Sequence, residues 1–223
     1  MRSPLVCSAL ALLTCIGCSS SSSAPPKTNA LDNSWNVITG KTALKAVKLM
    51  EDSHSADNRR KGIYELVKTD FGQRDPYTRR YRQIAQSDPD FTVRAAAIRA
   101  SNWSRDKRAV PVFIAAMNDQ NELVRWEAAK ALANVPDASA VDALTKTVGN
   151  AAETKNVRIA AADALRHYKN LAAARALVAT LGGKDFGLAW QSRQSLRKMT
   201  GNDLRYDERA WLEYLTSSAK PLG

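Results

Sequence analysis

Between residues 40 and 200 the hydrophobic positions recur with the period of an amphipathic helix. The segment 121–135 shows this clearly, because its apolar residues occupy offsets 0, 4, 7, 8 and 11 along one helical face. These residues are Val124, Ala128, Ala131, Leu132 and Val135. The small alanine side chains allow neighbouring helices to approach closely. The pattern therefore predicts an all-α protein of closely packed amphipathic helices.

The helical pattern repeats along the chain. Four copies are centred on Arg59, Arg94, Arg125 and Arg158, at spacings of 35, 31 and 33 residues, and a degenerate fifth copy places Trp190 another 32 residues on. A second amphipathic segment accompanies each copy; these segments cover residues 44–50, 78–85, 110–117, 141–148 and 171–181. Repeats of this length in helical sequence are typical of solenoids. We therefore expect an α-solenoid of about five helix pairs. In each pair the accompanying segment forms the A helix and the copy forms the B helix.

Polar residues mark the starts of several helices. Asp88, Asp106 and Asp119 each precede a helical segment, where a short acceptor side chain can bind free backbone N–H groups. Pro111 falls in the first turn of its segment, where the missing N–H is not needed. We expect these residues to fix where helices begin.

The carboxyl end has the features of a cap on the stack. Gly201 follows the last B segment, where a left-handed residue can close the helix, and Asp207 can start a further helix. Tyr206 and Trp211 have the spacing of a hydrophobic staple across that start. The end repeat of a solenoid needs such a cap to remain soluble.

The amino terminus predicts export. Residues 5–17 are apolar or small and uncharged, and they are too few to cross a membrane, which takes about 20 residues. Cys15-Ile16-Gly17 before Cys18 resembles the bacterial lipobox, although the usual first residue is Leu. The resemblance implies cleavage before Cys18 and lipidation of its thiol. We therefore expect a protein anchored in the bacterial cell envelope that faces the periplasm or exterior; a soluble secreted form and an uncleaved anchor are the alternatives.

The stretch after the signal is expected to be a tether. Residues 19–36 are polar, begin with a run of serines and contain Pro25 and Pro26, so they cannot bury enough apolar surface to fold. The sequence therefore divides into a signal peptide (1–17), a tether (18–39), a repeat domain (40–201) and a cap helix with a tail (202–223).

Three copies share a further signature, in which a turn with Asp or Asn is followed by Val-Arg and an alanine-rich helix. It stands at Asp90 with Val93-Arg94, at Asn121 with Val124-Arg125, and at Asn156 with Val157-Arg158. In this signature the copies resemble HEAT repeats of the phycobilisome-lyase type, a HEAT/armadillo-type solenoid family, over residues 40–200. The resemblance implies a ladder of arginines that brace adjacent repeats through a neighbouring turn or acid, ended by Trp190. Its residues are Arg59, Arg94, Arg125 and Arg158.

The sequence offers few groups for catalysis. All three cysteines, Cys7, Cys15 and Cys18, lie in the signal segment, and the two histidines are His54 and His167. Metalloenzymes with similar repeats, such as the deoxyhypusine hydroxylases, use repeated His-Glu pairs, which are missing here. No Ser-His-Asp or Cys-His grouping and no Gly-rich phosphate loop can be proposed. We therefore expect no metal, no cofactor and no enzymatic activity.

The resemblance also implies a binding surface. In HEAT stacks the B helices line the concave side, so residues one and five positions after each ladder residue should face a groove. The first three units, which include Ala95, make this stripe basic and aromatic. The later units make it weaker, with Ile159, Asp163, Gln191 and Ser195 at the equivalent positions. Trp126 could instead be core beneath an A helix, and the stripe could be ordinary solvated surface. The candidate partner-binding residues are Arg60, Tyr64, Arg99, Trp126 and Lys130.

Charge narrows the class of partner. Lys and Arg number 33 against 22 acids, a net charge of +11, and residues 59–108 alone hold 13 bases against 6 acids. Such an excess favours anionic partners. We expect a monomeric scaffold or adaptor that binds an acidic or extended protein segment and no nucleic acid. The alternative, if the signal does not function, is a nucleic-acid-binding protein similar to the alkylpurine DNA glycosylases; a subunit similar to bilin lyases is the third possibility.

Overall fold

The computed structural model describes residues 41–217, 221 and 222 of the chain. The expected signal peptide (1–17), the tether (18–39) and the lipidation site Cys18 lie outside the described residues. Within the described part, no helix combines the length and the apolar character needed to cross a membrane.

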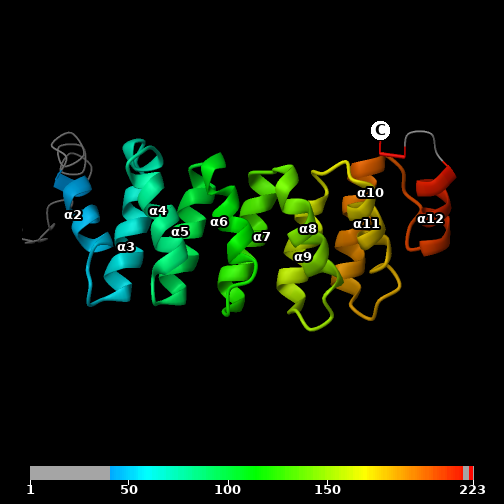
Figure 1. The fold of residues 1–223 in the computed structure, drawn as a ribbon, viewed down its shortest axis with the longest axis horizontal. Coiled ribbons are helices and arrows are strands. Elements are labelled where there is room, and N and C mark those ends of the chain that lie inside the picture. The colour runs from blue at the N-terminus through cyan, green and yellow to red at the C-terminus, as the bar shows by residue number, and fades with distance from the viewer. Residues whose placement is uncertain (1–40, 218–220, 223) are drawn as a thin grey trace, which may run out of the picture.

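The described chain is helical throughout and forms five helix pairs in a row, followed by a single helix (Figure 1). The pairs are α2 (Lys41–Met50) with α3 (Ala56–Val67), α4 (Tyr77–Ser87) with α5 (Phe91–Trp103), α6 (Val110–Ala116) with α7 (Glu122–Asn134), α8 (Val141–Gly149) with α9 (Lys155–Leu165), and α10 (Leu171–Val178) with α11 (Phe186–Thr200). The single helix is α12 (Glu208–Ser217), and short 3₁₀ turns precede α4, α6 and α8 at Phe71–Gln73, Lys107–Ala109 and Ala138–Ala140. The predicted all-α solenoid of five helix pairs with a carboxyl-terminal capping helix is confirmed.

The B helices begin at polar residues that define a common register. Ser55, Asp90, Asn121 and Asp185 each accept a hydrogen bond from a backbone N–H in the first turn of α3, α5, α7 and α11. Thr154 holds the equivalent place before α9. Because the same type of residue precedes each B helix, positions in different repeats can be compared by counting from this N-cap.

Two of the predicted caps have a different role. Asp106 does cap the turn before α6. Asp88 and Asp119, however, lie two residues before the true caps Asp90 and Asn121. Their carboxylates bind arginines of the preceding repeats instead. The prediction was wrong because two acceptors stand in one turn, and only the path of the backbone decides which of them caps the helix.

The five B helices lie side by side, each in contact with the next from α3 through α5, α7 and α9 to α11. Each also packs against the A helix of its own pair. Ala97, Ala128 and Ala161 are fully buried between the helices, and Gly62 of α3 lies so near α2 that an added Cβ would be 2.2 Å from Met50 N. We call the side of the B helices that faces away from the A helices the B-helix face.

The cap helix follows a left-handed glycine. Gly201 has a φ of 78° and closes α11, as predicted. Trp211 of α12 is fully buried, and its indole N–H donates to Arg205 O at 3.1 Å. Since α12 contacts α10, this apolar side chain helps to cover the end of the last helix pair.

Candidate partner-binding face

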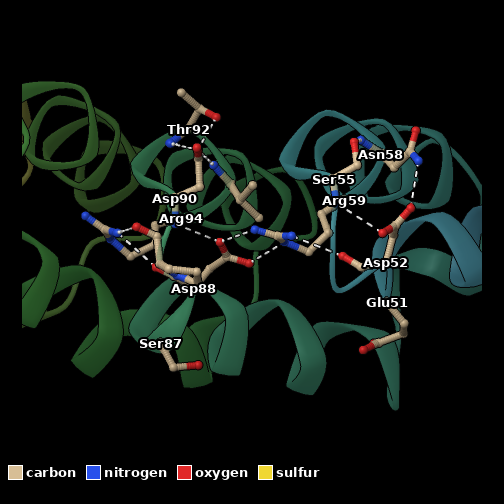
Figure 2. Close-up of polar contacts among 12 residues, drawn as sticks. Glu51, Asp52, Ser55, Asn58, Arg59, Ser87, Asp88, Asp90, Thr92 and Arg94 are labelled. Atoms are coloured by element: carbon tan, nitrogen blue, oxygen red, sulfur yellow. Dashed lines mark hydrogen bonds and ion pairs between the residues drawn. The ribbon is translucent and has the colours of Figure 1, made fainter.

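A row of arginines stands four residues after the N-caps of α3, α5, α7 and α9, and the first three link one repeat to the next. Figure 2 shows the first, in which Arg59 lies between two turns. Its Nε and Nη2 donate to the two carboxylate oxygens of Asp88 at 2.8 and 2.9 Å, and its Nη1 donates to Asp52 O at 3.0 Å. The acid belongs to the second repeat and the arginine to the first, so this rung of the ladder ties the two together.

The next two rungs repeat this geometry. Arg94 binds the carboxylate of Asp119 through Nε and Nη2, both at 2.9 Å, and Arg125 binds that of Glu153 at 2.7 and 2.9 Å. Burial raises the pKa of Asp119 and of Glu153, but the hydrogen bonds from the arginines and from backbone N–H groups outweigh it and hold each pKa below its ordinary value. Both acids are therefore ionised when the rungs are formed at neutral pH.

The ladder changes at its carboxyl end. Arg158 donates through Nε and Nη2 to Val148 O at 3.1 and 3.0 Å, and no carboxylate among the described residues binds it. In α11 the fourth residue after the N-cap is Ala189 rather than Trp190, so the predicted register of the fifth copy was wrong by one residue. Trp190 is accordingly exposed, and Ser195, which we expected in the groove, is buried.

The B-helix face begins with a hollow of about 430 Å³ between α3 and α5. Its apolar floor includes Ile63, Val67, Ala95, Ala96 and Ala100. Its rim carries three cations and two aromatic side chains that are about half exposed, namely Arg60, Lys61, Arg99, Tyr64 and Trp103. Asp57 also lines the hollow and pairs with Arg60, so this first hollow offers an apolar side chain a cavity whose rim carries mainly positive charge.

A second hollow lies between α7 and α9 and shares Leu123 with the first. Trp126 and Lys130 line it, together with Asp163. Trp126 is half-buried, and the Lys130 ammonium lies 3.9 Å from the centroid of its ring. The five candidate residues thus all lie on the B-helix face, divided between two adjoining hollows: Arg60, Tyr64 and Arg99 in the first, Trp126 and Lys130 in the second.

A buried acid lies where the two hollows meet. Glu127 is only 1% exposed, and its Oε1 accepts from Nε and Nη2 of Arg99 at 3.1 and 2.5 Å. Its Oε2 lies 3.6 Å from the Lys130 ammonium and has no hydrogen-bond partner among the described residues. Because two cations share this carboxylate, they present less net positive charge than the sequence suggested.

Residues 78–166, from α4 to the end of α9, match the family model for HEAT repeats. The chain contains HEAT-like repeats. No curated protein matches it as a relative. The matched HEAT segment carries the rungs at Arg94, Arg125 and Arg158 and includes the meeting point of the two hollows.

The exposed stripe of the HEAT stack extends one helical turn beyond the predicted positions. Those positions lie five and nine residues after each N-cap, and the residues four further on are Lys68, Trp103 and Asn134. Trp103 is 54% exposed and lines the first hollow. The Lys68 ammonium lies 3.7 Å from the centroid of the Tyr64 ring. Continuing the helical period by one turn would have identified these residues from the sequence.

Many of the cations in this part of the HEAT stack are already paired. Of the 13 bases in residues 59–108, 9 form an ion pair with a carboxylate. Those without such a pair among the described residues are Lys61, Arg74, Arg105 and Lys107. Much of the local positive charge is therefore engaged in ion pairs within the protein, some between repeats and some, as for Arg60 and Lys68, within a single repeat.

The described residues contain no group of three His, Cys, Asp or Glu side chains that could hold a metal ion. His54 lies in the turn before α3, where its Nδ1 is 3.0 Å from Ser53 Oγ, and His167 follows α9, where Arg166 Nε donates to its Nε2. The two histidines thus belong to different repeats.

Proposed function

We propose that this protein is a scaffold that holds an extended, acidic segment of a partner protein against its B-helix face, while a lipid on Cys18 anchors it in the bacterial cell envelope. HEAT repeats commonly serve as protein-interaction scaffolds. The observation that carries the proposal is the first hollow, where exposed Tyr64 and Trp103 stand beside Arg60 and Lys61 over an apolar floor. Aromatic residues and arginine dominate binding hot spots.

An extended segment fits the arrangement of the two hollows. They adjoin at Leu123 and follow one another along the row of B helices. Successive residues of an extended chain point to opposite sides, so alternate side chains can enter the hollows while the others remain in solvent. Carboxylates on such a segment would meet Lys61, whose ammonium has no ion pair among the described residues, and Arg60, whose exposed guanidinium also pairs with Asp57.

A protein partner suits this charge pattern better than nucleic acid does. A nucleic-acid backbone needs a continuous track of available cations. Here Arg99 and Lys130 share Glu127, and Asp163 lines the second hollow. The available positive charge therefore lies at the first hollow rather than along the whole row.

Site-specific photo-crosslinking in the producing cells tests the proposal. We place a photoreactive phenylalanine analogue at Tyr64 or Trp126 and, as a control, at Ala115, which is exposed on the A helix α6. Positions 64 and 126 are expected to capture the same protein through an acidic segment, and position 115 is not. Trp126→Ala should weaken capture at position 64. Equal capture from position 115 would contradict a groove on the B-helix face.

The anchor is tested separately. Mass spectrometry of the mature protein is expected to show an acylated amino terminus at Cys18, and Cys18→Ala should leave unprocessed precursor in the cell. An unmodified terminus at another residue, or retention of residues 1–17 in the wild type, would rule out the lipid anchor without affecting the groove.

A further inference from the structure

A polar hollow borders the first hollow at the carboxyl ends of α5 and α7. It is lined by Arg99, Asn102, Trp103, Arg105 and Asn134. No acidic residue of the described chain is among these lining groups, and two of them carry a full positive charge. Arg99 and Trp103 line the first hollow as well, so an apolar cavity and a cationic one share a wall.

Arg105 has an unusual backbone for its residue type. Its φ is 47°, in the left-handed region that favours glycine, whereas the corresponding turn after α11 uses Gly201 with a φ of 78°. Its guanidinium is exposed and has no hydrogen bond or ion pair among the described residues. Strained backbone is retained at ligand sites when it places a useful group, and here it places a free cation at the rim of the polar hollow.

The other polar side chains add donors to the same hollow. Arg99 uses Nε and Nη2 on Glu127, and its Nη1 has no partner among the described residues. The Oδ1 of Asn102 accepts from Asn134 Nδ2 at 3.2 Å, so the amide N–H groups of Asn102 are available to a ligand. Guanidiniums bind carboxylates through strong, charge-assisted hydrogen bonds, and the Asn102 amide adds a neutral donor.

We propose that the two hollows together bind the carboxyl terminus of a partner polypeptide. The last, apolar side chain enters the first hollow, and the terminal carboxylate binds Arg99, Arg105 and Asn102. In a terminal residue the side chain and the carboxylate leave the same carbon atom, which matches two cavities that share Arg99 and Trp103. This inference rests on the proposed function and specifies which part of the acidic segment is recognised.

The helix ends oppose an anion here, but weakly. The carboxyl end of a helix carries roughly half a negative elementary charge, and both α5 and α7 end at the polar hollow. Arg99 and Arg105 supply two full positive charges at shorter range, of which Glu127 offsets a part through Arg99. Binding is therefore expected to depend strongly on Arg105, the cation without an ion pair.

The test compares N-acetyl-leucyl-leucine with its carboxyl-terminal amide, using the full-length protein in detergent. Binding is followed through the ¹⁵N signal of the Trp103 indole, which is assigned with Trp103→Phe. The free acid is expected to shift this signal in a saturable manner, with a Kd at least about tenfold lower than that of the amide. Equal binding of acid and amide, or the lack of a shift with either, would overturn the inference.

Arg105→Gly separates binding from stability. Glycine suits the left-handed backbone, so the melting temperature should stay the same or rise, while the Kd for the free acid should rise about tenfold and that for the amide should hardly change. Arg105→Lys should retain part of the discrimination. A variant Arg105→Gly that binds the acid as tightly as the wild type would show that the cation has no role.

Two further probes distinguish other anions. N-acetyl-aspartyl-leucinamide carries its carboxylate on a side chain; if it binds as well as the free acid, recognition of the terminus is wrong. Inorganic phosphate that shifts Trp103 at the same concentration would likewise indicate a general anion site. If all peptide probes fail while the Tyr64 crosslink persists, this inference fails alone; loss of the crosslink with intact peptide binding would contradict the proposed function instead.

Discussion

An arginine in a complete rung of the ladder satisfies several acceptors at once. Arg125 binds both carboxylate oxygens of Glu153, and its Nη1 donates to the backbone oxygens of Asp119 and Gln120 at 2.8 and 3.0 Å. The Glu153 side chain is 9% exposed. Removing one partner of such a group costs more than the bond itself contributes, because the remaining charge stays buried without compensation.

Arg125→Ala is therefore expected to lower the free energy of unfolding by about 2–3 kcal/mol. The matched control is Arg158→Ala, because Arg158 binds one backbone carbonyl and no carboxylate among the described residues. This variant should lower the free energy of unfolding by only about 1 kcal/mol. Urea unfolding measures both. Equal losses, or no change in the midpoint of Arg125→Ala, would mean that the carboxylate rungs add nothing to stability.

The same rung predicts a dependence on pH. The pKa of Glu153 in the folded protein lies below its ordinary value, so its contribution is fully present above the pKa of the unfolded chain, about 4.3, and is lost as the pH falls through the folded pKa. In Arg125→Ala the buried Glu153 carboxyl has lost its arginine partner, so protonation of this carboxyl stabilises the folded variant. The stability difference between wild type and Arg125→Ala should thus be largest near pH 7 and shrink below about pH 4.5. A difference that stays constant down to pH 3 would contradict this.

At the scale of elements, the contact between α2 and α3 depends on a single glycine. A Cβ at Gly62 would lie 2.2 Å from Met50 N and 2.6 Å from Ala46 O, which are backbone atoms and cannot rotate away. Gly149, the last residue of α8, has no atom within 4 Å of an added Cβ.

Gly62→Ala should therefore separate the two helices and cost about 3 kcal/mol or more through overpacking. Gly149→Ala should be neutral or stabilise by up to about 1 kcal/mol, because alanine favours the helix. Thermal unfolding of the two variants compares them directly. If both behave alike, the close approach of α2 and α3 is not a feature of the folded protein.

The period of the apolar residues was sufficient to predict the helix pairs, because amphipathic segments and turns are local properties of the sequence. The register of α11 was missed because this helix lacks the Val-Arg signature, and Trp190 was aligned in place of Ala189. Arg99 and Glu127 are 28 residues apart in the sequence and pair across two neighbouring B helices. No local sequence pattern reveals this pair. The candidate residues do lie together on the B-helix face, but their charges and the division into two hollows required the tertiary contacts.

For the whole molecule, the order of the contacts follows the order of the chain. Each B helix contacts the next along the row, so a change at one end reaches the other only through every repeat between them. In such a stack stability is approximately the sum of the repeats and of their neighbouring interfaces. A local defect is therefore expected to have local consequences.

The cap helix offers the clearest test of this property. Trp211 is fully buried and donates to Arg205 O, so Trp211→Ala should cost about 3–5 kcal/mol at the carboxyl end. Because α12 contacts α10, hydrogen exchange should accelerate in α10 and α11 while α3 and α5 keep their protection. Trp190→Ala, at an exposed tryptophan of the same end, is the control and should leave exchange nearly unchanged. Uniform acceleration along all five pairs would show that the stack unfolds as one unit and that the cap secures the whole molecule rather than its last repeat.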